Sequence, residues 1–186
     1  MSIYVKSERA GRRVLQSVST FLSKKLKLKV NESKSRVDKP RNRSLLGFSI
    51  GKDGRVYVSD KSIRRFKDRI RELRRRTRGR RIEQVIREGA NYLQGWRGYY
   101  NDAYQKQRFR ELTGWMKRRL RCYLWKQWGR AGYRELRKRG VSRDLAWNTC
   151  TSPQGPWRLS RSPALAYALP TRYFVAMGLP LLHVNV

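Results

Sequence analysis

The sequence predicts an α+β fold, in which a small mixed N-terminal part precedes an all-helical bundle and an irregular apolar C-terminal tail. In residues 1–60, short apolar runs alternate with turn residues, whereas after Asp60 the apolar residues recur at helical spacing. Pairs of proline with serine or glycine crowd the C-terminal region, which closes with the apolar stretch 164–182. We therefore expect two domains, 1–60 and 61–186.

The N-terminal part is expected to begin with the end of a strand at residues 3–5 and to continue as a helix. Ser7 is a typical capping residue, and Glu8 places a negative charge in the first helical turn. Apolar residues then recur at helical spacing as far as Leu26. The pattern predicts a single amphipathic helix that ends near this leucine.

Short strands are expected to follow that helix. Residues 28–30 and 35–37 are strand candidates. The apolar run 45–50 is followed by a loop with two glycines at 51–54 and by residues 55–58. Two short runs around a glycine-containing loop predict a β-hairpin.

Two long helices are predicted directly after Asp60. The first carries an apolar stripe from Ile63 to Leu73, with arginines on its other faces, and is broken at Arg78-Gly79. The second begins near Ile82, and its apolar face continues to Tyr100.

A third long helix is predicted from about Arg108 to Trp128, and a short helix over 133–139 that ends at Gly140. At about 100° per residue, the cationic face of the third helix lies opposite its apolar face. The residues expected on the apolar face are Phe109, Leu112, Met116, Leu120 and Tyr123. Those expected on the cationic face are Arg110, Arg118, Arg121 and Trp125.

Net charge is the strongest functional signal in the composition. The chain has 46 Lys and Arg against 13 Asp and Glu, a net charge of +33. Residues 61–81 carry +10 and residues 106–143 carry +12, whereas the segment 82–105 between them carries −1. Charge in two blocks is typical of a surface for a polyanion, and counterion release makes nucleic acid the expected partner. No apolar run is long enough to span a membrane, so no membrane partner is expected.

Catalytic and metal-binding groups are poorly supplied. Cys122 and Cys150 are far apart and His183 is the single histidine, too few for a Cys/His zinc site. A serine or cysteine nucleophile needs a general base, and no second histidine is present to serve as one. Metal-assisted catalysis needs clustered carboxylates, and the aspartates are scattered. The sequence therefore predicts no catalytic residue, no metal and no cofactor, and two reduced thiols.

Two segments have alternative interpretations. The run from Arg64 to Arg81 has only Asp68 and Glu72 as counter-charges, which favours phosphate contact over a merely solvated face. The segment 91–100 is rich in glycine and aromatic residues. Its periodicity favours helix core with close packing at the glycines, and the alternative is a helix end that presents an exposed tyrosine to a ligand.

Trp125 is out of pattern on a cationic helix face. One interpretation is that it stacks on a base while Arg118 and Arg121 hold phosphate. The other is that an aromatic side chain of the C-terminal region, such as Trp157 or Tyr173, packs over it. The sequence leaves both interpretations open.

Four segments resemble the maturase-specific region, also called the thumb or X domain, of bacterial group II intron-encoded reverse transcriptases. They are NYLQGWRGYY (91–100), WMKRRLRCYLWKQW (115–128), LRKRGVSRDLAW (136–147) and GPWRLSRSP (155–163). The resemblance covers roughly residues 62–182. It implies a helical thumb that binds structured group II intron RNA and aids its folding and splicing.

The N-terminal part resembles the end of the palm of the same family. Residues 3–14 are similar to the segment just after the YxDD motif of the polymerase, Lys34 matches a palm lysine, and LLGF (45–48) matches the primer grip. The chain begins past the position of YxDD, and the family's H-N-H module is not matched. The resemblance thus implies a palm remnant over 1–60 and a maturase domain over 61–186, in a cytoplasmic protein that is no enzyme on its own.

Two alternatives stand beside the maturase interpretation. The chain could complete a split RNA-directed DNA polymerase whose fingers and palm come from a separate chain. It could also be a non-functional remnant, with a sheet edge exposed by missing strands. Under the maturase interpretation, the residues expected to contact RNA are Lys34, Arg64, Arg65, Arg71, Arg75, Arg76, Arg110, Arg118, Arg121, Trp125, Lys126 and Arg158.

Overall fold

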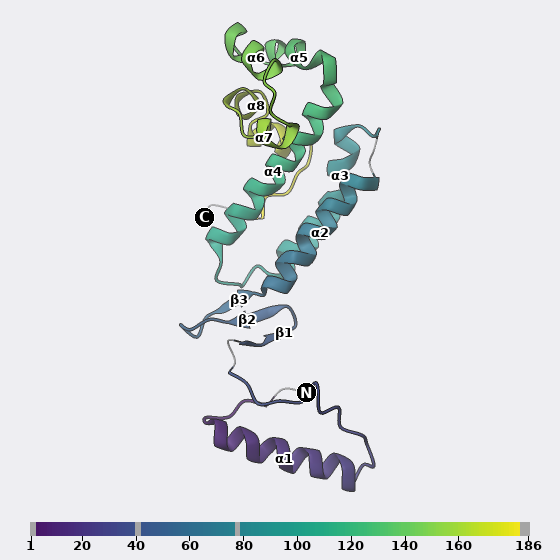
Figure 1. Ribbon diagram of the computed structural model, residues 1–186, viewed down its shortest axis with the longest axis vertical. Coiled ribbons are helices and arrows are strands. Elements are labelled where there is room, and N and C mark those ends of the chain that lie inside the picture. Colours follow the sequence, from purple (N-terminus) through teal and green to yellow (C-terminus); the bar gives the residue numbers. More distant parts are fainter. Residues whose placement is uncertain (1–2, 40–41, 77–78, 183–186) are drawn as a thin grey trace. The chain divides into compact units, whose positions relative to one another are not determined.

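The computed structural model describes residues 3–39, 42–76 and 79–182, without the side chains of residues 74–76. The chain divides into two compact units, Met1–Ser59 and Asp60–Val186. The first unit holds one helix and a small sheet, and the second is helical (Figure 1). The predicted α+β class is confirmed.

Helix α1 (Glu8–Lys24) begins where the sequence predicts, because the Ser7 hydroxyl accepts a hydrogen bond from the Ala10 amide. Gly11 is the one buried residue of this helix. It lies against Val37, and a Cβ at Gly11 would come within 2.7 Å of the valine side chain. The segment around Val37 therefore packs closely on α1, although it forms no strand.

The sheet of the first unit is antiparallel and follows chain order. It contains β1 (Ser44–Leu45), β2 (Phe48–Ile50) and β3 (Val56–Val58). The predicted hairpin is confirmed as β2 and β3. The run 45–50, expected as one strand, is two strands, because Leu46 and Gly47 form a tight turn with positive φ angles of 51° and 84°.

The other strand predictions are wrong. Residues 3–5, 28–30 and 35–37 pair with no strand among the described residues. Short apolar runs of this length do not by themselves distinguish a strand from an extended loop. What makes β2 and β3 strands is their pairing, from Phe48 opposite Val58 to Ile50 opposite Val56.

The second unit begins with three long helices, α2 (Asp60–Arg76), α3 (Ile82–Tyr99) and α4 (Lys106–Trp128). All three lie close to their predicted ranges. Aromatic side chains join them, because Phe66 and Phe109 both contact Trp96, at ring-centroid distances of 4.7 and 5.6 Å. Phe66 is fully buried, so this aromatic cluster forms the core at one end of the three helices.

The segment 91–100 is helix core, as its periodicity predicts. Trp96 and Tyr100 are buried. The expected close packing at its glycines is wrong, because no described neighbour lies within 4 Å of a Cβ built at Gly95 or Gly98. Tyr99 is exposed and packs edge-on against Tyr100.

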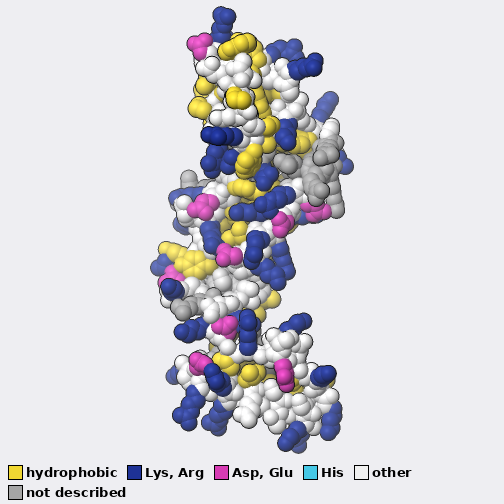
Figure 2. All heavy atoms as spheres, in the orientation of Figure 1, with side chains coloured by type: hydrophobic (Ala, Val, Ile, Leu, Met, Phe, Trp, Pro, Cys, Tyr) yellow, Lys and Arg dark blue, Asp and Glu magenta, His cyan; other side chains and the backbone are white. Residues whose placement is uncertain are grey.

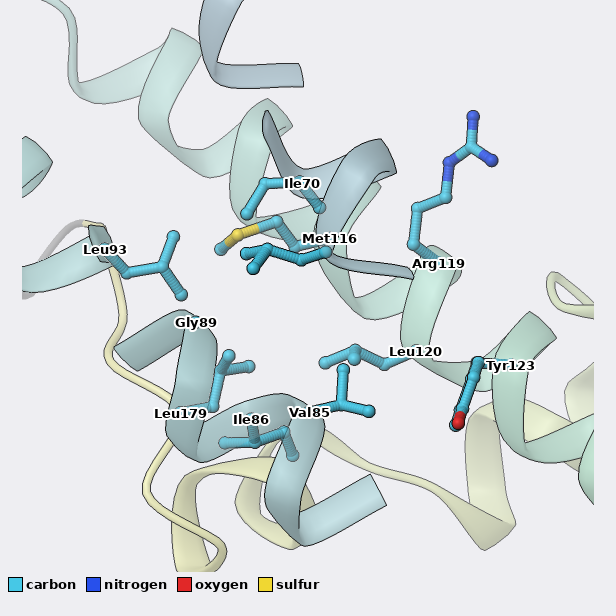
Figure 3. Close-up of a pocket in the computed structure, with 11 residues that line it drawn as sticks. Ile70, Val85, Ile86, Gly89, Leu93, Met116, Arg119, Leu120, Tyr123 and Leu179 are labelled. Carbon is cyan, nitrogen blue, oxygen red and sulfur yellow. The ribbon is translucent and has the colours of Figure 1, made fainter. Parts of the chain in front are cut away.

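A small cavity of about 50 Å³ lies between α2, α3 and α4 (Figure 3). Aliphatic side chains line most of it, among them Ile70, Leu93 and Met116. Arg119 contributes its aliphatic stem, and its guanidinium points away from the cavity. A cavity so small and apolar is a packing defect of the core rather than a ligand site.

The C-terminal tail is not irregular as predicted. A single 3-10 turn, η2 (Gly129–Ala131), leads from α4 into a series of short helices. They are α5 (Gly132–Lys138), α6 (Arg143–Cys150), α7 (Pro156–Leu159), α8 (Pro163–Ala168) and α9 (Thr171–Ala176). Two of them start at a proline, and proline is well suited to the first turn of a helix. Pro156 and Pro163, which indicated turns, are therefore helix starts, whereas Pro153 lies outside the helices.

Helix α4 is the centre of the second unit. Helices α2 and α3 lie on one side of it, and α7 packs on another (Figure 1). In the middle of α4 every residue from Met116 to Leu124 is buried or half-buried. The cationic face predicted for α4 is therefore covered over much of its length.

Candidate nucleic-acid interface

Helix α2 presents cations to solvent. Arg64 and Arg65 are exposed and, among the described residues, pair with no carboxylate. The two acids in the middle of the helix are already engaged, because Arg69 pairs with Glu72 and Arg71 with Asp68. An exposed helix face with this excess of arginine is suited to the paired oxygens of phosphate.

An arginine–tryptophan cluster joins α2, α4 and α7. Trp115 of α4 has Arg119, Arg71 and Lys67 at 5.1, 5.7 and 6.0 Å from its ring centroid. Trp157 of α7 has Arg118 at 3.7 Å and Arg119 at 4.4 Å. The members of the cluster are thus Lys67, Arg71, Trp115, Arg118, Arg119 and Trp157.

Arg118 is occupied by the C-terminal region. Its Nη2 donates to the Trp157 carbonyl at 2.9 Å and its Nε to the Ser160 hydroxyl at 3.2 Å. Burial lowers the pKa of this guanidinium, and the neighbouring charge of Arg161 lowers it further. A guanidinium stacked on Trp157 and bonded in this way serves as a brace between α4 and α7.

Arg121 is engaged in the same manner. Its Nε donates to the Leu169 carbonyl at 3.0 Å, beyond the end of α8. Burial lowers its pKa, and Lys117, which donates to the Thr171 hydroxyl at 2.9 Å, also has a pKa lowered by burial. These bonds satisfy a backbone carbonyl and a hydroxyl of the C-terminal region, and we therefore withdraw Arg118 and Arg121 from the residues that we assign to RNA.

The interpretation that Trp157 or Tyr173 packs over Trp125 is wrong, and stacking of Trp125 on a base stays a prediction. The Trp125 ring is half-buried and packs edge-on against Trp128, at 6.2 Å between centroids. A Cβ at Gly132 would lie 3.0 Å from the Trp125 ring, so the start of α5 rests on it. Trp157 lies instead on Arg118, and Tyr173 lies near Arg139, whose guanidinium is 5.8 Å from its ring centroid.

The remaining predicted residues are dispersed. Arg110 and Lys126 are exposed near opposite ends of α4, and Arg158 is exposed on α7. Lys34 is exposed in the first unit, in a turn where its amide bonds to Asn31. The side chains of Arg75 and Arg76 lie outside the described residues. Figure 2 shows Lys and Arg outnumbering Asp and Glu on the face in view.

Sequence reasoning missed Trp115, Arg119 and Trp157 as candidate residues. A signal for the first two is present, because Trp115 and Arg119 are four residues apart and therefore share a helix face. No comparable signal exists for Trp157, which reaches the cluster only through the packing of α7 on α4.

Within the described residues, no group of three or more His, Cys, Asp or Glu side chains is placed to hold a metal ion. No helix in the same ranges is long and apolar enough to cross a bilayer. Cys122 is buried and Cys150 is exposed, and both are free thiols.

Comparison with protein families finds a match within the second unit. The family model for the group II intron, maturase-specific domain matches residues 63–141. The resemblance expected from the sequence is confirmed over this stretch. The match runs from α2 to just past the end of α5 and includes every member of the arginine–tryptophan cluster except Trp157. A search of curated proteins finds no match to the chain.

Proposed function

We propose that the chain binds structured group II intron RNA and assists its folding and splicing. The match of residues 63–141 supports a role related to group II intron maturases. The observation that carries the RNA contact is that this matched region bears exposed cations without acidic partners among the described residues, Arg64 and Arg65. Such cations gain by replacing the counterions of the RNA backbone.

In this proposal the RNA carries out the chemistry and the protein does not. The family match is to the maturase-specific region rather than to the polymerase site. The cationic helices would neutralise phosphates that approach one another as the intron folds. Phosphate contacts of this kind position the RNA, and contacts to unpaired bases add specificity.

The first experiment measures affinity for a group II intron RNA and for an unrelated RNA of equal length, over a series of salt concentrations. We expect a preference for the intron that persists at about 0.15 M salt, where the Debye length is about 8 Å. Intron splicing at a Mg²⁺ concentration too low for the RNA alone should increase when the protein is added. Equal affinity for both RNAs that decreases steeply with salt would mean that the chain binds RNA only through nonspecific charge, and it would overturn the proposal.

A second candidate is that the chain completes an RNA-directed DNA polymerase together with a separate chain. Exposed apolar residues in the last turns of α1 and just after it favour it, because Phe21, Leu26 and Leu28 are each about half exposed. Apolar groups grouped in this way are suited to a protein partner. The test is DNA synthesis on an RNA template when a chain carrying the fingers and palm is mixed with this one.

A further inference from the structure

We infer that Trp115 is a stacking platform for one unpaired nucleotide of the bound RNA. The inference rests on the proposed function and names the part of the RNA that the arginine–tryptophan cluster takes. Trp115 is half-buried on α4, so part of its indole is accessible to solvent. Three cations from two helices surround it, Lys67 and Arg71 from α2 and Arg119 from α4.

Trp115 differs from the other five tryptophans in how its ring is covered. Trp157 has a guanidinium stacked at 3.7 Å, and Trp96, Trp125, Trp128 and Trp147 each pair with another aromatic ring. Among the described residues, Trp115 pairs with no aromatic ring, and its nearest cation lies 5.1 Å from the ring centroid. Arg119 therefore lies over the indole within cation–π range, but farther from it than the guanidinium stacked on Trp157.

The cations around Trp115 suit a nucleotide better than a bare anion. A base can stack on the indole while its phosphate lies toward Lys67 and Arg71. The pairing of Arg71 with Asp68 is an exposed ion pair of low net energy, so a phosphate can displace the carboxylate. Gly114 precedes the tryptophan, and a Cβ built there meets no described atom within 4 Å. The surface of α4 is therefore open at this glycine.

A stacking platform also distinguishes paired from unpaired nucleotides. In a duplex the flat faces of the bases are stacked on one another and inaccessible, whereas a bulged or looped nucleotide presents its face. A cluster made only for charge would bind paired and unpaired RNA equally. The platform therefore predicts a preference for an unpaired nucleotide that depends on the aromatic ring.

The experiment uses the full chain and two RNA hairpins that differ only in one bulged nucleotide, replaced by the fluorescent base 2-aminopurine. We expect the wild-type protein to bind the bulged hairpin about tenfold more tightly than the paired one, with quenching of the 2-aminopurine as it stacks. Trp115→Leu should abolish this difference, while Trp115→Phe should keep most of it. Circular dichroism of both variants checks that the fold is kept.

Trp147→Leu is the matched control. Trp147 is 60% exposed on α6, outside the cluster, and its loss should leave the preference for the bulged hairpin intact. If Trp115→Leu weakens binding to both hairpins equally, or leaves the preference unchanged, the platform is wrong. A wild-type protein that prefers intron RNA but binds both hairpins equally also overturns the platform alone. Equal affinity for intron and unrelated RNA overturns the proposed function instead.

Discussion

Helices α2 and α4 are both rich in arginine, yet the structure uses their charges in different ways. On α2, Arg64 and Arg65 extend into solvent without an acidic partner among the described residues. On α4, Arg118 and Arg121 donate hydrogen bonds to groups at Trp157, Ser160 and Leu169. The first pair is available to an external polyanion, and the second is bonded within the protein.

The difference arises from what covers each helix. Helix α2 buries one stripe and leaves the rest to solvent, as its fully buried Phe66 and exposed arginines show. Helix α4 contacts α2 through Arg71 and Trp115 and α3 through Trp96 and Phe109, and it packs against α7 on another side. The carbonyl oxygens that end short helices need donors, and the guanidinium of an arginine supplies several at once. Charge content alone therefore does not tell a binding surface from a structural brace.

The largest expected effect is on stability. Replacing both Arg118 and Arg121 with alanine should lower the free energy of unfolding by about 3 kcal/mol, because it removes hydrogen bonds to a largely buried segment and a guanidinium stacked on Trp157. The matched control is Arg64→Ala with Arg65→Ala, which should change it by about 0.5 kcal/mol or less. Urea unfolding measures both. Equal changes in the two double variants would show that the proposed division between α2 and α4 is wrong.

The next effect is on RNA affinity. Here the α2 pair, which should hardly affect stability, is the pair whose loss should matter. Arg64→Ala with Arg65→Ala should reduce the slope of log affinity against log salt by about 2, because each arginine is expected to neutralise one phosphate. Filter binding to intron RNA at several salt concentrations gives the slope. Arg130→Ala with Arg134→Ala is a control of equal charge, since both residues are exposed at η2 and α5. A slope that falls equally in both double variants would indicate that charge matters only in total.

The sequence predicts the helices of the second unit well, because their apolar periodicity is sustained over several turns. For α2 the sequence pattern correctly separates the faces of the helix. The apolar stripe from Ile63 to Leu73 leaves the other faces to arginine. The prediction fails for α4 because periodicity within one helix cannot show a second packing partner. Arg121 is placed correctly opposite Met116, but the segment that covers this arginine ends at Leu169, 48 residues away.

The candidate site shows the same limit. Arg71 and Trp115 meet only because α2 and α4 lie together, and Trp157 enters the cluster from α7. Interactions between residues so far apart in sequence depend on tertiary packing. Trp125, in contrast, is conspicuous in the sequence, and the structure gives it a local role against Gly132.

The smallest expected effect tests how tightly each helix is packed. Gly132 faces the Trp125 ring of α4, and a Cβ at this glycine would lie 3.0 Å from the ring. A Cβ at Gly89 of α3 would lie 3.7 Å from Leu73 of α2, which is ordinary van der Waals contact. Gly132→Ala should therefore destabilise the protein by about 1 kcal/mol through overpacking. Gly89→Ala should stabilise it by about 1 kcal/mol, because alanine favours the helix and the added methyl group lies beside the cavity. Thermal and urea unfolding measure the two changes, and effects of the same sign would mean that α4 is packed no more tightly than α2.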